Sequence, residues 1–183
     1  MIQLFRFSFL LLLTTTFSFQ AEAQGRKKKK HDPERAQETK TEFLKVDTGM
    51  NDFFQSAYGY AIFPSIGKGA IGIGGAAGKG VVYQRGNVVG GVNMTQISVG
   101  FQFGGQAYSE VIFFEDTDAY KRFVQNEFQF AAQASAVALK SGISANAKYT
   151  DGVAVFTMAQ GGLMYEASIG GQRFKFVPPN KMK

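Results

Sequence analysis

The chain has 183 residues, a formal net charge of +6, no cysteine, no tryptophan and one histidine. The absence of cysteine excludes a disulfide framework, a thiol nucleophile, a thiolate metal site and a lipid-modified N-terminal cysteine, and a single histidine excludes a multi-histidine metal site. With 45% hydrophobic and 19% charged residues, the chain is too apolar to be disordered as a whole, and its length fits one domain with a real core.

The first 23 residues are predicted to be a secretory signal peptide. Arg6 precedes an apolar run of 13 residues, Phe7 to Phe19, and Ala21-Glu22-Ala23 offers the small residues that a signal peptidase reads. The alternative is a retained membrane anchor, but the run is shorter than the roughly 20 residues that a spanning helix needs. We therefore expect an exported protein, periplasmic or secreted, that begins at Gln24.

Residues 24–32 are predicted to be a flexible polybasic arm, because they are charged and lack apolar periodicity. Without the arm's five basic residues, the sequence after residue 23 has 14 basic and 13 acidic residues, so the remainder is nearly neutral. The arm is a candidate electrostatic contact with an anionic membrane, and the alternative is a solubilising linker. His31 is expected to be a solvated tail residue. The five basic residues are Arg26, Lys27, Lys28, Lys29 and Lys30.

Two helices are predicted next, at the start of a single domain over residues 33–183. Asp32-Pro33-Glu34 is typical of a helix start, and the first helix is expected from Pro33 to about Val46. Asp47 or Thr48 is the expected cap of the second helix, which ends at Gly59. Its apolar residues at helical spacing are Met50, Phe53, Phe54 and Ala57.

From Tyr60 the pattern changes to short strands separated by glycine. A further helix, capped by Asp116 or Thr117, is expected to carry Tyr120 and Phe123. The predicted fold class is α+β and β-rich, with a curved antiparallel or barrel-like sheet of about eight strands, two N-terminal helices and one middle helix. The expected strands are residues 60–64, 79–85, 88–95, 96–102, 108–114, 153–158, 162–169 and 172–177.

The sequence predicts no enzyme, cofactor or metal site. The segment from Gly67 to Gly72 matches a dinucleotide-binding pattern, but no helix follows it and no acidic residue stands about 20 positions on. Glu115, Asp116 and Asp118 cluster where a helix begins, so capping explains them. Because the domain is close to neutral and exported, nucleic-acid binding is not expected.

The glycine-rich segment resembles a known family. Ala61-Ile-Phe-Pro64, Gly67-Lys-Gly69 and the run from Gly72 to Gly80 are similar to motifs of the SYLF domain family. The similarity continues through Ser98 to Gln106 and Val111 to Phe114, and it covers roughly residues 35–175. The layout is similar to that of stand-alone secreted members of the family in bacteria.

The resemblance implies a lipid-binding domain without enzymatic activity. Relatives in fungi and animals bind phosphoinositides, and yeast-type members are tied to actin. For this chain, the resemblance implies binding of anionic phospholipid by surface basic residues. Lys68, expected in the glycine turn, and Lys79 match basic positions of the glycine motif. Arg85, on the same predicted strand face as Lys79, is a further candidate. The alternatives are a structural or protein-interaction module of the cell envelope and a small outer-membrane β-barrel.

Overall fold

The computed structural model of this chain describes residues 30–71, 73–98, 106–131, 134–161 and 167–182. The predicted leader and the arm residues Arg26 to Lys29 lie outside the described residues. Within the described part, the predicted α+β, β-rich class is confirmed. The elements are α1 (Pro33–Val46), α2 (Met50–Ser56), β1 (Gly59–Ile71), β2 (Ile73–Gln84), β3 (Asn87–Ser98), β4 (Gln106–Phe114), α3 (Thr117–Val124), β5 (Ser135–Ala138), η1 (Ile143–Asn146), β6 (Val153–Gln160), β7 (Ala167–Ser168), β8 (Arg173–Val177) and η2 (Pro179–Lys181).

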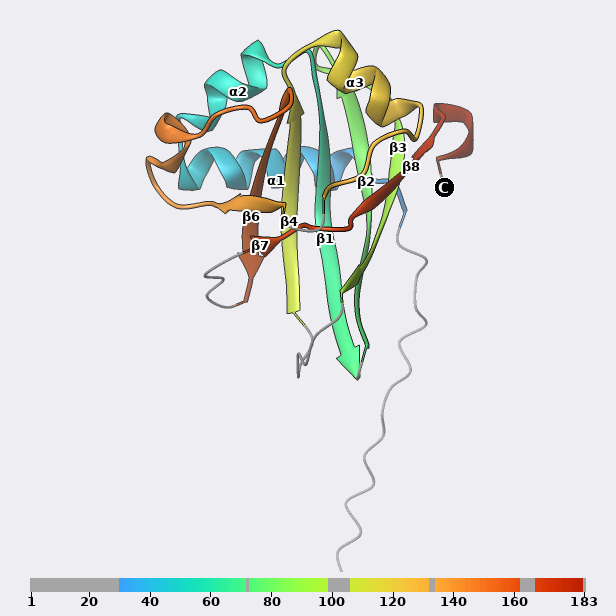
Figure 1. Ribbon diagram of the computed structural model, residues 1–183. Helices are drawn as coiled ribbons and strands as arrows, with labels where there is room; N and C mark the ends of the chain where they lie inside the picture. The colour runs from blue at the N-terminus through green and yellow to red at the C-terminus, as the bar shows by residue number, and fades with distance from the viewer. Residues whose placement is uncertain (1–29, 72, 99–105, 132–133, 162–166, 183) are drawn as a thin grey trace, which may run out of the picture.

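The strands form one open, curved sheet in the order β7-β5-β6-β4-β1-β2-β3-β8 (Figure 1). β7 and β8 are its two edges. The pairing of β5 with β6 is parallel, whereas the other described strand pairs are antiparallel, so the predicted antiparallel sheet is mixed at this point. A parallel pair needs a long crossover, which the segment containing η1 supplies.

β1, β2 and β3 form a meander of long strands. The strand predicted to end at Pro64 continues to Ile71, with a bulge after Ile62 that accommodates the proline. The glycine segment therefore forms the end of β1 and the start of β2 rather than one long turn. The backbone groups of β1 pair with β2 on one side and with β4 on the other. Lys68 lies within β1, opposite Ala76, and not in the expected glycine turn.

The helices begin at side-chain caps in two of three cases. The carboxylate of Asp32 accepts hydrogen bonds from the backbone N–H groups of the first turn of α1, and Asp116 does the same for α3, as predicted. Neither predicted cap is used by α2. The carboxylate of Asp47 instead accepts hydrogen bonds from the backbone N–H groups of Gly49 and Ser144. These two bonds link the start of α2 to η1. No helix among the described residues has the length and apolar character needed to cross a bilayer.

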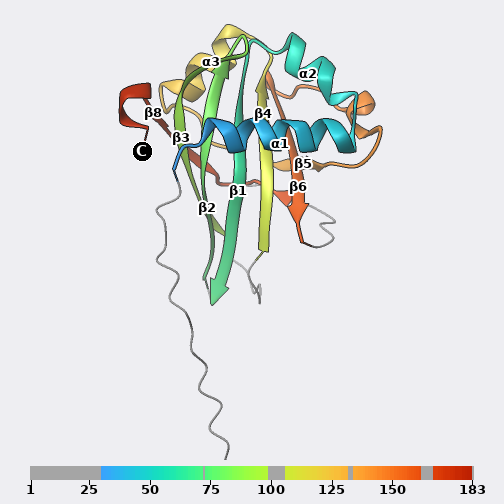
Figure 2. The same cartoon turned by 180° about the vertical axis from the view of Figure 1, so that it is seen from behind.

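The sheet separates two cores. On one side, which we call the α1 face, buried Phe43 of α1 and Phe54 of α2 pack against Tyr60, Phe113 and Phe156 of the sheet. On the other side, the α3 face, Phe123 of α3 packs among the buried residues Phe63, Ile112, Phe114 and Phe174. Figure 2 shows α1 crossing the strands, with β1, β2 and β3 extending beyond it. Part of the α1 face therefore has no helix over it.

Candidate functional site

Basic side chains gather on the part of the α1 face that α1 leaves uncovered. Lys79 of β2 and Lys175 of β8 both stand opposite Asn93, one on each side of β3, and Arg173 stands opposite Thr95. Residues directly opposite in antiparallel strands point to the same face. Because neighbouring strands lie about 5 Å apart, the backbones of Lys79 and Lys175 are about 10 Å apart.

Alternation along the strands fixes the face on which these cations lie. A Cβ atom at Gly78 or Gly80 would meet the side chains of Ile66 and Phe63, which belong to the α3-face core, so Lys79 between the two glycines points to the α1 face. Phe174 is likewise buried in the α3-face core, so its neighbours Arg173 and Lys175 point the other way and are exposed.

Ile97 adds an apolar side chain to this surface and is 75% exposed. Its cross-strand neighbour on β2 is Gly75, which has no side chain to cover it, and the described pairing of β8 with β3 stops at Thr95. We call the surface formed by Lys79, Ile97, Arg173 and Lys175 the basic sheet face.

The cations of the basic sheet face have no acidic partner in the described part of the chain. The ion pair found there, between Arg122 and Asp151, involves none of them. Their register neighbours are Asn93, Thr95 and Gln129, none of which carries a charge. This face therefore presents uncompensated positive charge with an exposed isoleucine at one end.

His31 connects the polybasic arm to this surface, contrary to the prediction of a solvated tail residue. Its side chain is only 7% exposed, and its Nδ1 lies 3.0 Å from the carbonyl oxygen of Gly80. The ring lies against Gly91, where a Cβ atom would come within 2.6 Å of it. Burial lowers the pKa of His31, and the charge of Lys79 lowers it further. The neighbouring arm residue Lys30 is exposed.

Lys68 lies in a different environment, on the α3 face. Its Nζ is 5.4 Å from the centre of the Tyr108 ring. The Nε2 group of buried Gln172 donates to the Tyr108 hydroxyl at 3.2 Å and to Oε2 of Glu110 at 3.0 Å. The structure therefore places Lys68 and Lys79 on opposite faces of the sheet, where they do not form one site.

Glu110 is fully buried at the centre of this polar cluster. Its Oε1 has no hydrogen-bond partner in the described part of the chain, and neither does Oε1 of Gln172. Burial raises the pKa of Glu110 to about 7, although the hydrogen bond from Gln172 and the charge of Lys68 oppose this shift. The cluster is a buried polar feature, whereas the basic sheet face is open to solvent.

Arg85 stands apart from both lysines. It occupies the turn after β2 with a φ of 50°, and its guanidinium lies 5.5 Å from the centre of the Tyr58 ring. Its backbone N–H donates to the carbonyl of Tyr58 at 3.3 Å. This turn is at the opposite end of β2 from the glycine segment, so Arg85 lies outside the basic sheet face.

The sequence does not identify Arg173 and Lys175 as site residues. Their alternation with Phe174 and Phe176 predicts that they share one exposed face of a strand. Nothing in that pattern identifies β3 as the partner strand, and this pairing is what brings them beside Lys79.

Among the described residues, no group of three or more His, Cys, Asp or Glu side chains is arranged to hold a metal ion.

Residues 95–177 match the model of the family described as Ysc84, Las17-binding protein actin regulator. Residues 95–177 carry a domain of this family. The predicted SYLF resemblance is thereby confirmed. The matched segment includes Arg173 and Lys175, whereas Lys68, Lys79 and Arg85 precede it.

A named relative supports the same assignment. Over 123 residues, the chain is 31% identical to beta cell expansion factor A of Aeromonas veronii. The alignment covers 66% of this chain and 46% of that protein, so the chain spans less than half the length of this relative.

Proposed function

We propose that this Ysc84-family domain binds the surface of anionic phospholipid membranes, without enzymatic activity, through the basic sheet face. The observation that carries the proposal is the cross-strand register that sets Lys79, Arg173 and Lys175 together on one face, with exposed Ile97 at its end. An anionic membrane offers negative headgroups for the cations and an apolar interior for the isoleucine. The resemblance to lipid-binding SYLF domains supports the same ligand.

The expected strength follows from the number of cations. Each lysine or arginine near an anionic bilayer contributes about 1 kcal/mol. The three cations of the face give about 3 kcal/mol on this scale, and the five of the arm, which continues from exposed Lys30, are a second electrostatic contribution. Because the Debye length falls to about 3 Å at 1 M ionic strength, binding is expected to weaken steeply with salt.

The proposal includes an exported protein from which residues 1–23 are removed. Cleavage before Gln24 leaves Arg26 to Lys30 close to the new N-terminus. N-terminal sequencing of the protein recovered from its native host tests this part, and an intact Met1 would contradict it.

Vesicle flotation tests the binding itself. Vesicles of phosphatidylcholine alone are compared with vesicles in which phosphatidylglycerol replaces part of it. We expect the protein to float with the anionic vesicles only, and the triple variant Lys79→Glu, Arg173→Glu, Lys175→Glu to stay at the bottom of the gradient.

The matched control reverses three exposed lysines outside the basic sheet face, Lys45, Lys121 and Lys140, and so makes the same change in net charge. This control is expected to float with the anionic vesicles. Equal behaviour of the two triple variants would contradict the proposed interface, and no flotation of the unmodified protein would contradict membrane binding.

The second candidate is a protein-interaction module. It is favoured by the description of the matched family, which names a protein that binds Las17 and regulates actin. A protein partner that is captured equally well by the charge-reversed triple variant and by the unmodified domain would support this candidate over membrane binding.

A further inference from the structure

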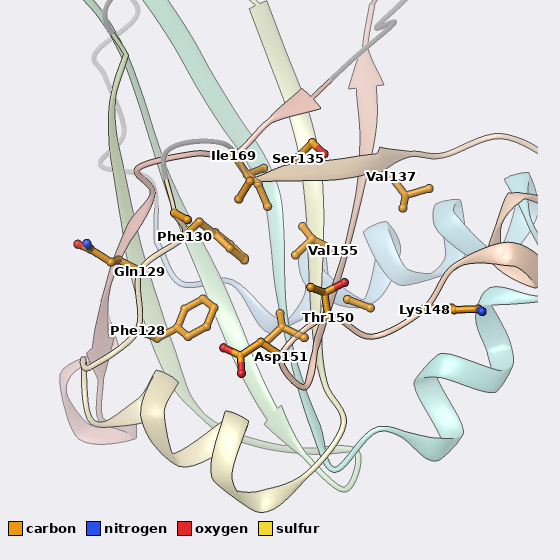
Figure 3. A pocket seen from close by; sticks show the side chains of 14 residues that line it. Phe128, Gln129, Phe130, Ser135, Val137, Lys148, Thr150, Asp151, Val155 and Ile169 are labelled. Atoms are coloured by element: carbon orange, nitrogen blue, oxygen red, sulfur yellow. The ribbon is translucent and has the colours of Figure 1, made fainter.

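A pocket opens on the α3 face, on the other side of the sheet from the basic sheet face. Its volume is about 450 Å³. The lining is largely apolar, and Figure 3 shows Phe128 and Phe130 from the segment after α3, Val155 from β6 and Ile169 from the segment after β7 facing the pocket. Ligand pockets of proteins span roughly 300–1,000 Å³ and are typically apolar with a few polar groups, so this volume suits a small, mostly apolar molecule.

The polar groups of the pocket leave one charge without a partner. Asp151 lines the pocket, but its Oδ2 accepts a hydrogen bond from Nη1 of Arg122 at 2.9 Å, and Nη2 of Arg122 binds the carbonyl of the same residue at 2.9 Å. The guanidinium also lies 5.9 Å from the centre of the Phe128 ring. The charge of the Asp151 carboxylate is therefore balanced by the guanidinium of Arg122.

Lys148 is the remaining charged residue of the lining. It is exposed and forms no ion pair within the described part of the chain. Figure 3 shows it at the opposite side of the pocket from Phe128 and Phe130. The pocket therefore has an apolar end beneath two aromatic rings and a cationic rim at the other end.

We propose that this pocket binds the single alkyl chain of an anionic amphiphile, either a free fatty acid or a lysophospholipid. The chain lies against Phe128, Phe130, Val155 and Ile169, and the anionic head lies at Lys148. The volume is in the lower part of the range for ligand pockets, which suits one chain rather than the two chains of a bilayer phospholipid. This site is separate from the basic sheet face and does not depend on the proposed membrane binding.

Calorimetric titration of the full chain with dodecanoate, below its micellar concentration, tests the proposal. Decanoate should bind more weakly, with about a threefold to fourfold change in Kd for each methylene removed, because the chain is transferred from water to an apolar site. A parallel titration with lauroyl-lysophosphatidylglycerol shows whether the pocket prefers a lysophospholipid or a free fatty acid of the same chain length. Dodecyltrimethylammonium, with the same chain and the opposite charge, should bind at least tenfold more weakly than dodecanoate.

Two variants locate the site. Lys148→Glu should weaken dodecanoate binding at least tenfold, whereas Lys140→Glu, an exposed lysine that does not line the pocket, should leave it unchanged. Val155→Phe fills the floor of the pocket and should abolish binding of every chain. If Val155→Phe does not fold, the comparison of Lys148→Glu with Lys140→Glu still decides the matter.

The proposal is overturned if dodecanoate does not bind, or if Lys148→Glu binds it as tightly as Lys140→Glu does. The triple reversal of the basic sheet face should leave dodecanoate binding intact, and Lys148→Glu should leave vesicle flotation intact. Failure of one proposal is therefore distinguishable from failure of the other.

Discussion

Lys68 and Lys79 come from the same glycine-rich segment, yet they lie in opposite environments. Lys79 stands on an uncovered sheet face with Arg173 and Lys175 across β3. Lys68 lies over the Tyr108 ring, on the face that holds buried Glu110. Burial lowers the pKa of Lys68, and the nearby charge of Glu110 opposes that shift. The two lysines share a motif but not an environment, because the sheet separates their side chains.

The largest expected effect is on stability and concerns Glu110. Its folded-state pKa of about 7 lies above the ordinary value of 4.5, so the folded protein holds this proton more tightly than the unfolded chain does. The resulting contribution to the free energy of unfolding is complete below about pH 4.5 and is lost as the pH rises through 7. A pKa difference of this size corresponds to a loss on the order of 3 kcal/mol.

Glu110→Gln should abolish this pH dependence and make the protein more stable than the unmodified chain at about pH 8. Urea unfolding at about pH 5 and pH 8 measures both quantities. Glu127→Gln, at an exposed position, is the control and should keep the original pH dependence. A pH dependence that persists unchanged in Glu110→Gln would show that the buried carboxyl is not its source.

A second prediction sets the two lysines against each other. Lys79→Glu changes the charge of the basic sheet face by two units, which corresponds to about 2 kcal/mol, or roughly a 30-fold weaker partition onto anionic vesicles. Lys68→Glu makes the same charge change on the opposite face and should leave partitioning nearly unaltered while it destabilises the fold beside Glu110. Equal loss of partitioning in both variants would remove the distinction between the two faces.

A third prediction concerns the contact that holds His31. Gly91→Ala places a Cβ atom within 2.6 Å of the ring and should displace it from Gly80, at a cost of about 1–2 kcal/mol in the free energy of unfolding. Because the chain has one histidine, its NMR signal is unambiguous. The pKa of His31 should lie below 6.5 in the unmodified protein and rise towards that value in Gly91→Ala.

The matched control for this contact is Gly67→Ala. A Cβ atom at Gly67 has no neighbouring atom within 4 Å, so this variant should keep both the stability and the histidine pKa of the unmodified chain. A histidine that titrates identically in all three proteins would contradict the described packing.

The smallest expected effect is spectroscopic. The chain contains no tryptophan, so Ile97→Trp introduces a single reporter on the basic sheet face, and the high exposure of residue 97 predicts little change in stability. Its fluorescence should shift to the blue when anionic vesicles are added. Val88→Trp, at the exposed start of β3, should show no shift, and a shift of equal size there would argue against a defined interface.

Elements with their own local signals were predictable. The sequence Asp32-Pro33-Glu34 predicts the start of α1, because an acid, a proline and a second acid favour a helix start. The alternation around Phe174 predicts β8 as a half-buried strand. Glycine was misleading in β1 and β2. Local propensity indicates a turn for so many glycines, whereas pairing with strands on both sides holds them extended.

The candidate site was predictable only in part. The glycine motif indicates Lys79, but the partners of Lys79 depend on the pairing of β3 with β8, which joins residues far apart in the chain. The charged neighbours of His31 in the sequence predict a solvated residue. Its burial depends on the carbonyl oxygen of Gly80, which lies 3.0 Å from Nδ1, and on Gly91, whose missing side chain leaves room for the imidazole ring.

The pairing of β8 with β3 also has a consequence for the order of folding. β1, β2 and β3 are joined by short hairpins, whereas β8 returns from the C-terminal end of the chain to the far edge of the sheet. Contacts between distant segments carry a larger loop-closure entropy and form later than local ones. The three like charges therefore converge only when β8 docks. An anionic surface that binds all three cations stabilises the docked edge by mass action, so association and the docking of β8 are thermodynamically coupled.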